Sequence, residues 1–160
     1  IQKHTEVFML RQSTAADCRE VYNLICDMEA TALDYEKFAS IYLQQLADEN
    51  YYCLIYEESG KTCGMLNLRF EQQLHHTARI AEIMEFAVAQ DYRNRGVGKI
   101  MFAEAVKIAK AQGCVQLEVA CNRLRHNTHR FYQREGMHNF HFKFSLPLNG
   151  DCSEENRLGR

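Results

Sequence analysis

The residue types best suited to chemistry stand together in one short segment, Arg93-Asn94-Arg95-Gly96-Val97-Gly98, at the start of a strongly apolar helical pattern. A helix that begins here exposes free backbone N–H groups and the positive end of its dipole, which together form an anion site. Gly96 and Gly98 let the backbone approach a pyrophosphate closely, because neither carries a side chain. Further positive charge comes from Arg93, Arg95 and Lys99. The segment therefore predicts a phosphate-binding turn.

Two glycines before a helix also fit other sites, and they fit ordinary turn chemistry. A Walker A loop requires Gly at Arg93 and Ser or Thr at Ile100, and the chain has neither. A dinucleotide fingerprint requires a third Gly at Met101, although Glu118 does lie at the distance expected for an acid that binds ribose. A nucleotide-binding oxidoreductase therefore stays open as an alternative.

The elements that position the turn can be predicted from periodicity. Apolar residues at helical spacing indicate helices near 18–28, 35–46, 96–112 and 127–135. Strand patterns run near 7–11, 51–56, 62–70, 79–89, 115–120 and 139–146. Thr14 and Asp17 resemble a capping box ahead of the first helix, and residues 58–61 resemble a hairpin turn. An antiparallel meander followed by a β-α-β unit predicts an α/β fold, with a mixed, mostly antiparallel sheet and helices on both faces.

The long strand before the turn carries an irregularity. Ile83 and Phe86 are three residues apart, and this breaks the alternation that Phe86 and Val88 continue. A β-bulge near Met84-Glu85 would bring Ile83 and Phe86 to one face. Because bulges splay a sheet and uncover backbone groups, this one is expected to make room for a flat ligand arm.

Composition restricts the partners. The chain has 160 residues, 46% of them hydrophobic and 25% charged, which fits one soluble domain over residues 1–160. Residues 1–8 and 149–160 are expected to be flexible termini. A net charge of -2 and a pI near 6.4 give no electrostatic reason to expect a nucleic-acid partner. No apolar stretch is long enough to span a bilayer, so no membrane partner is expected.

The cysteines indicate the compartment. All seven lack a C-x-x-C partner, and most lie in apolar runs. They are therefore expected to be buried reduced thiols, and the odd count together with the lack of a signal peptide predicts a cytoplasmic location.

Two segments resemble signatures of the GNAT acetyltransferases. Residues 93–98 match their R-x-x-G-x-G loop, and residues 83–88 resemble the strand before it. Residues 130–136 resemble their F-Y-x-x-x-G segment, in the family's order and at its spacing. The resemblance implies a GNAT-type fold and acetyl-CoA as co-substrate. It implies acetyl-CoA contacts from Phe86, Ala87, Val88, Arg93, Asn94, Arg95, Gly96, Val97, Gly98, Lys99, Asn127 and Phe131.

Short stretches over nearly the whole chain look closer to one subfamily, the aminoalkylphosphonate N-acetyltransferases. They are residues 21–26, 74–76, 80–85, 125–126, 129–132 and 141–144. This resemblance implies an aminophosphonate or related small primary amine as acceptor, with help from a divalent cation. His75 and His76 are the candidate substrate contacts, although an exposed loop pair is the plainer interpretation. Two histidines do not define a metal site, so no metal ligand is assigned. Homodimers are frequent in the family.

The chemistry requires a base, because an amine must lose a proton before it attacks a thioester. Glu82 and Glu85 are the candidates, and Glu82 is favoured because it lies in the stretch most like the phosphonate subfamily. In the family pattern Tyr132 protonates the leaving thiolate. Direct transfer in a ternary complex is expected. A non-catalytic acetyl-CoA sensor could dispense with all three residues, and this chain keeps them.

Overall fold

The computed structural model describes residues 7–149, which divide into two compact units at the junction of Val119 and Ala120. The first unit holds the sheet, and the second holds one helix with an irregular segment after it. Most of the expected flexible termini, 1–8 and 149–160, lies outside the described residues. Phe8 already begins the first strand, so the expected N-terminal stretch is too long.

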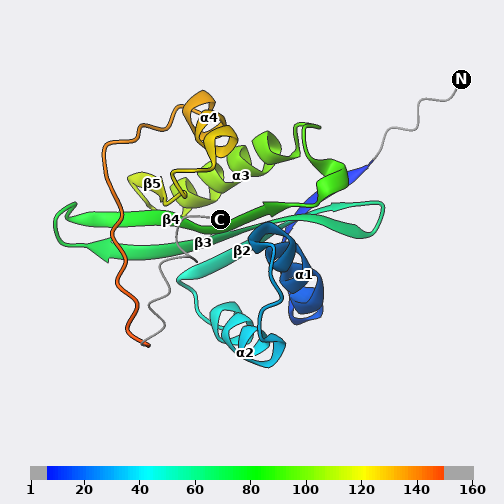
Figure 1. The fold of residues 1–160 in the computed structure, drawn as a ribbon. Coiled ribbons are helices and arrows are strands. Elements are labelled where there is room, and N and C mark those ends of the chain that lie inside the picture. The colour runs from blue at the N-terminus through cyan, green and yellow to red at the C-terminus, as the bar shows by residue number, and fades with distance from the viewer. Residues whose placement is uncertain (1–6, 150–160) are drawn as a thin grey trace, which may run out of the picture. The chain divides into compact units, whose positions relative to one another are not determined.

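The sheet of the first unit has five strands. They are β1 (Phe8–Gln12), β2 (Tyr51–Glu58), β3 (Lys61–Gln73), β4 (Ala78–Val88) and β5 (Gln116–Val119). Their order in the sheet is β1-β2-β3-β4-β5 (Figure 1). The first four run antiparallel to their neighbours, and β5 runs parallel to β4. The predicted mixed, mostly antiparallel sheet is thereby confirmed.

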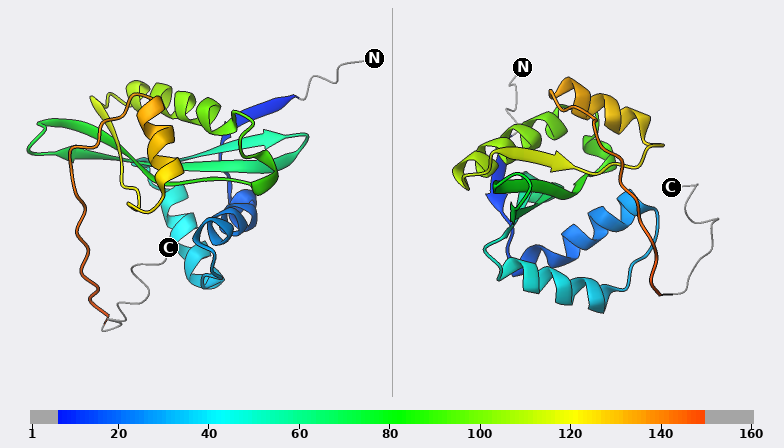
Figure 2. Two further views of the ribbon diagram at one scale, coloured as in Figure 1. Left: turned by 45° about the horizontal axis from the view of Figure 1, so that its top comes forward. Right: turned by 90° about the vertical axis from the view of Figure 1, so that its left-hand side faces the viewer.

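Helices cover both faces of this sheet, as predicted. On one face lie α1 (Cys18–Glu29) and α2 (Tyr35–Leu46), and on the other lies α3 (Val97–Ala111) (Figure 2). On the α3 face the packing is so close that a Cβ built on Gly64 would lie 2.7 Å from the sulfur of Met101. Within residues 7–149, no helix combines the length and the apolar character that a bilayer crossing requires.

Two local signals of the sequence have the expected structure. The Thr14 N–H donates a 2.7 Å hydrogen bond to the Asp17 carboxylate, which closes a capping box on the 3-10 turn Ala15–Asp17 ahead of α1. Ser59 and Gly60 connect β2 to β3 with φ angles of 52° and 76°. Positive φ at both central residues is the geometry of a type I′ turn, whose twist matches that of the strands it joins.

The predicted bulge is present in β4. Glu85 is the register partner of Asn67, whereas Ile83 is the partner of the next residue, Leu68. Met84 is therefore the extra residue of the bulge, and its side chain is exposed. The bulge confirms the interpretation of the broken alternation, because the extra residue changes which side chains of β4 face α1 and α2.

The second unit contains α4 (His126–Arg134), and Gly136, two residues after its end, has a φ of 89°. The prediction of a further strand over residues 139–146 is wrong, because within the described residues this segment joins no sheet. Its apolar residues do alternate, and Phe140, Phe142 and Phe144 are all exposed. Alternation describes side chains only, and a strand also requires a partner for its backbone.

Candidate active site

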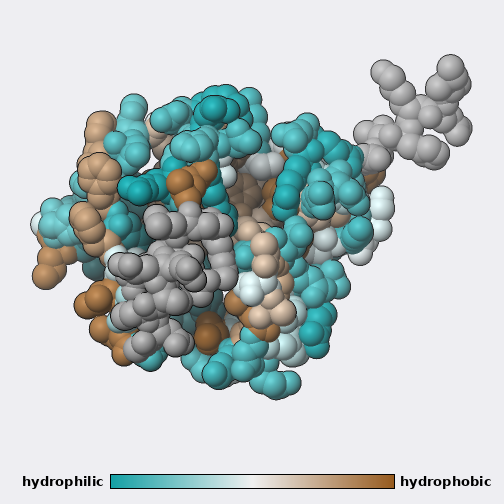
Figure 3. Space-filling model, in the orientation of Figure 1, coloured by the Kyte–Doolittle hydropathy of each residue, from teal (hydrophilic) through white to brown (hydrophobic). Residues whose placement is uncertain are grey.

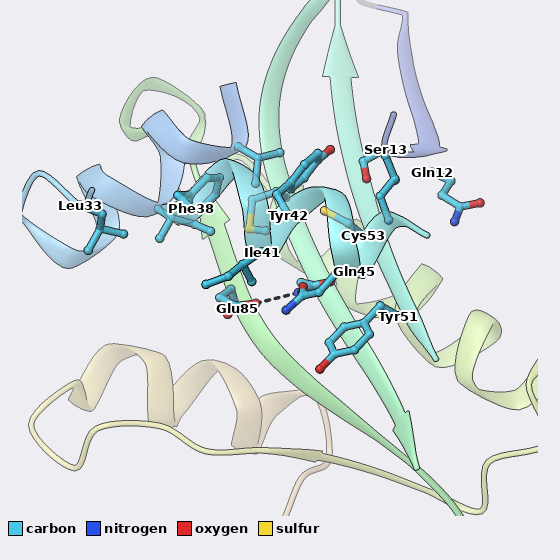
Figure 4. A pocket seen from close by; sticks show the side chains of 15 residues that line it. Gln12, Ser13, Leu33, Phe38, Ile41, Tyr42, Gln45, Tyr51, Cys53 and Glu85 are labelled. Atoms are coloured by element: carbon cyan, nitrogen blue, oxygen red, sulfur yellow. Dashed lines mark hydrogen bonds between the residues drawn. The ribbon is translucent and has the colours of Figure 1, made fainter. Parts of the chain in front are cut away.

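A cavity of about 210 Å³ opens between the sheet and the two helices α1 and α2 (Figure 4). Most of its wall is apolar, and among the described residues Glu85 is the only charged one that lines it. The uncharged polar side chains of the wall are Gln12, Ser13, Tyr42, Gln45, Tyr51 and Asn67. A concave apolar surface with a few convergent polar groups is typical of a small-molecule site.

Glu85 is held by the neighbouring strand. Its register partner on β3, Asn67, donates a 2.9 Å hydrogen bond from Nδ2 to Glu85 Oε2 and a second 2.9 Å bond to Gln45 Oε1 of α2. Figure 4 shows Glu85 and Gln45 close together, with Ile41 beside them. Burial raises the pKa of Glu85 above its usual value, and the Asn67 bond opposes that change only in part. The carboxylate is therefore a better proton acceptor than an exposed one.

Glu82 lies in a different environment. Its Oε2 accepts a 2.8 Å hydrogen bond from the Arg69 guanidinium, which also lies 3.4 Å from Glu71. Glu82 does not line the cavity. The structure thus separates the two candidate bases, because one faces the cavity and the other is in an ion pair outside it.

The turn before α3 has the backbone geometry of an anion site. Asn94 and Gly96 have φ angles of 59° and 80°, and a Cβ built on Gly96 would meet no atom within 4 Å. The open space in front of Gly96 and the helix end behind it are what a phosphate group requires. Figure 3 shows hydrophilic residues gathered over this turn. Val97 is buried, so it can serve a ligand only through its backbone N–H.

The two arginines of the turn contact carboxylates. Arg93 donates from Nε to the Val88 carbonyl and lies 2.9 Å from Asp27 of α1, with both bonds near the surface. Arg95 lies 3.5 Å from the buried Glu58. Both cations therefore tie the turn to the rest of its unit, and Lys99 is exposed one turn into the helix.

The strand β4 extends beyond the end of its parallel neighbour, β5. The ladder between β4 and β5 ends at the pair Ile83 and Val119, whereas β4 continues to Val88. Ala87 belongs to the core under α1 and α2, so its side chain is not available to a ligand, while Phe86 and Val88 are half-buried. Beyond the bulge, β4 therefore has no strand partner on its β5 side within the described residues, and the expected splay stays a prediction.

His75 and His76 lie in the turn between β3 and β4, outside the cavity. Their rings are 4.3 Å apart, and His76 Nε2 is 3.5 Å from Glu118 Oε1 on β5. Among residues 7–149, no group of three or more His, Cys, Asp or Glu side chains is arranged to hold a metal ion. The described residues do not fit a bound divalent cation.

The second unit carries the remaining predicted residues. Tyr132 on α4 is buried, and burial raises its pKa above the usual value. Its ring centroid lies 5.3 Å from that of Phe131. The Asn127 side chain accepts a 3.0 Å hydrogen bond from Arg130, one turn further along the helix. Tyr132 therefore stays protonated at neutral pH and can donate a hydrogen bond.

Of the residues that line the cavity, sequence reasoning identified Glu85 and missed the others, including Asn67, which donates a hydrogen bond to Glu85, and Gln45, which accepts one from Asn67. Asn67 is buried, and it stands alone as a polar residue between Gly64 and Leu68 in β3. A single amide within an apolar strand is a usable signal, because a buried polar group must find a partner. Gln45 gave no comparable signal, since it lies next to another Gln on an otherwise amphipathic helix.

Known proteins resemble this chain in sequence and in fold. The model of the "Acetyltransferase (GNAT) family" matches residues 17–137. The aminoalkylphosphonate N-acetyltransferase of Salmonella typhimurium is 34% identical over 139 residues, which are 87% of this chain and 90% of that protein. An aminoglycoside N-acetyltransferase in complex with CoA has a TM-score of 0.83 at 12% identity, covering 93% of this chain and 99% of its own. Glucosamine-6-phosphate N-acetyltransferase from Arabidopsis thaliana has a TM-score of 0.75 at 20% identity, covering 90% and 100%.

Proposed function

Because the chain belongs to the GNAT acetyltransferase family and is an N-acetyltransferase, we propose that it moves the acetyl group of acetyl-CoA onto the primary amine of a small molecule bound at the Glu85 cavity. One observation carries this proposal. Glu85 is a half-buried carboxylate with a raised pKa, and among the described residues that line the cavity it is the only charged one. Such a group can receive the proton that an ammonium ion must lose.

The proposed reaction moves one proton before it moves the acetyl group. Glu85 removes a proton from the bound ammonium ion, directly or through one water. The free amine then attacks the carbonyl carbon of the thioester, and a tetrahedral oxyanion forms. The attacking nitrogen gives up its second proton to solvent as this oxyanion collapses and the C–S bond breaks, which leaves an N-acetyl amide and a thiolate. A backbone N–H near Phe86 is the proposed donor to the oxyanion, since a fixed donor aimed at developing charge lowers the barrier.

Acetyl-CoA would bind through backbone groups. The N–H groups at the start of α3 and the open space at Gly96 suit its pyrophosphate. The stretch of β4 beyond the β5 ladder suits the pantetheine arm, with contacts from residues 86–88. Asn127 and Phe131 of α4 are the further proposed contacts. The ion pairs of Arg93 and Arg95 imply that these cations mainly shape the turn.

The leaving thiolate needs a proton, because its thiol has a pKa of about 8.5 by analogy with cysteine. Tyr132 is the proposed donor. Its hydroxyl is protonated at neutral pH and can donate a hydrogen bond to the forming thiolate, although burial raises the pKa of Tyr132 and so makes the phenol a weaker acid.

Direct transfer is the proposed route, without an acetyl-enzyme. Burial raises the pKa of both Cys114 and Cys121, which disfavours the thiolate that a covalent mechanism would require. Six cysteines of residues 7–149 are free thiols, although only Cys18 and Cys63 are fully buried, and Cys152 lies outside the described residues.

An aminoalkylphosphonate is the second, finer candidate for the acceptor. Its support is the 34% identity with the Salmonella enzyme. No Arg, Lys or His among residues 7–149 lines the cavity, so a phosphonate group would have to lie outside it. His75 and His76 are the proposed contacts of that group. A homodimer and a cytoplasmic location stay predictions.

The base is tested by comparing Glu85→Gln with Glu82→Gln in an assay of thiol release from acetyl-CoA. Glu85→Gln is expected to lower kcat by about 100- to 10,000-fold, the usual range for loss of a general base. Glu82→Gln should lose much less, because it removes an ion pair outside the cavity. The opposite order would assign the base to Glu82.

The pH profile separates a lost base from a damaged fold. A base acts only when deprotonated, so wild-type kcat should fall as pH drops through the raised pKa of Glu85, and this limb should vanish in Glu85→Gln. A raised folded-state pKa contributes stability only at low pH, and that contribution is lost as pH rises through it. Glu85→Gln removes a charge that is unfavourable in the folded state at pH 7, so its melting temperature there should be no lower than that of the wild type.

A further inference from the structure

Apolar side chains form the inner wall of the Glu85 cavity. Its apolar side chains come from both helices and from the sheet: Ile25, Leu33, Phe38, Ile41, Leu46 and Met65. Leu33 and Ile41 are 36% and 55% exposed, so they lie toward solvent, whereas Met65 is buried at the floor. We infer that the acceptor carries an uncharged apolar group beside its amine, and that this group fills the cavity while the amine lies against Glu85. The inference rests on the proposed function and names its substrate class.

Charge is the first argument. An anionic group inside the cavity would lie close to Glu85 with no cation among the lining residues to offset it. Two nearby arginines of the same face are already engaged: Arg11 binds Asp17 and Glu57, and Arg69 binds Glu82 and Glu71. A cationic amine, by contrast, forms a favourable pair with Glu85. The cavity therefore admits the ammonium end and excludes anions.

Shape is the second argument. The volume of about 210 Å³ is below the roughly 300–1,000 Å³ of sites for drug-sized ligands, so the group is a short alkyl chain or a single ring. Phe38 is held by aromatic neighbours, with ring centroids 5.3 Å from Tyr22 and 6.3 Å from Tyr42. A wall fixed in this way is preformed for an apolar ligand, which needs no polar contact to bind.

The first test is a series of unbranched primary amines from ethylamine to hexylamine, followed by thiol release from acetyl-CoA. We expect kcat/KM to rise about four-fold for each added methylene until the cavity is full, from the transfer free energy of a buried CH₂. Replacing the chain end with a carboxylate, as in 5-aminopentanoate, should lower kcat/KM on the order of 100-fold relative to pentylamine.

A substitution in the cavity wall tests whether the cavity causes the preference for apolar amines. Ile41→Lys places a cation at the cavity wall, and it should flatten the chain-length series while favouring 5-aminopentanoate. Leu43→Lys is the matched control, because Leu43 is 50% exposed on the same helix and does not line the cavity. This control should keep the wild-type series.

The outcomes are distinct. A flat series in an active wild-type enzyme, or equal use of pentylamine and 5-aminopentanoate, would overturn the inference and leave the proposed function standing. Equal effects of Ile41→Lys and Leu43→Lys would also overturn it. Absence of thiol release with every amine, aminophosphonates included, would instead overturn the proposed function and the inference with it.

Discussion

Asn67 fixes the carboxylate that we propose as the base, Glu85. Its NH₂ group bonds Glu85 and Gln45 at once, so the amide is fixed between a strand and a helix. The bond also limits how far burial can raise the pKa of Glu85, because it stabilises the charged form. A carboxylate with burial alone would hold its proton too firmly, and an exposed one would not accept it.

Tyr132→Phe tests the proposed proton donor. The variant keeps the ring, so its packing next to Phe131 should persist and the cost in stability should stay within about 1–3 kcal/mol. Loss of a general acid is expected to lower kcat by about 100- to 10,000-fold with little change in the KM for acetyl-CoA. Steady-state kinetics over a range of pH measure both quantities. Normal turnover throughout that range would make Tyr132 a packing residue.

At the scale of elements, β3 and α3 approach each other through a glycine. Gly64→Ala would place a Cβ 2.7 Å from the sulfur of Met101, a side chain with no exposed surface. Overpacking of this kind typically costs about 1–3 kcal/mol, so we expect a lower free energy of unfolding in urea. Met101→Ala should recover part of the loss when combined with Gly64→Ala. Purely additive effects in the double variant would mean that the two residues do not share this contact.

Periodicity predicted most helices and strands, because an element that is buried on one face has apolar residues at a regular spacing. The four helices and the first five strands lie where the pattern places them, with shifts at their ends. The segment 139–146 has alternating apolar residues but joins no strand in the described residues, because strand pairing depends on a partner that is distant in the sequence. The same limit applies to the base. Glu82 and Glu85 look alike in the sequence. Only the structure shows that Glu82 pairs with Arg69 and that Glu85 lines the cavity.

At the scale of the whole molecule, the fold alone does not name the acceptor. Structures described as aminoglycoside and glucosamine-6-phosphate acetyltransferases share the fold at TM-scores of 0.83 and 0.75, although their named substrates differ widely. A shared scaffold with different acceptors places specificity in the side chains that line the acceptor site. The lining of the proposed acceptor site, the Glu85 cavity, therefore carries more information about the substrate than the sheet does.

CoA binding should stabilise the entire protein, and a single methyl group should remove that effect. A ligand that binds only the folded state adds about 2.7 kcal/mol at a concentration 100 times its Kd, so wild-type protein should melt at a higher temperature with CoA and at an unchanged one with NAD.

Gly96→Ala should lose the CoA shift, because its Cβ enters the space proposed for the pyrophosphate. Gly113→Ala is the matched control, since Gly113 has a similar φ of 74° and the same open surroundings at the other end of α3. Each alanine should lower the melting temperature without ligand through a strain of about 1–2 kcal/mol, and only Gly113→Ala should keep the CoA shift. A full CoA shift in Gly96→Ala would place the phosphate site elsewhere, whereas a shift with NAD in the wild type would favour the nucleotide-binding alternative.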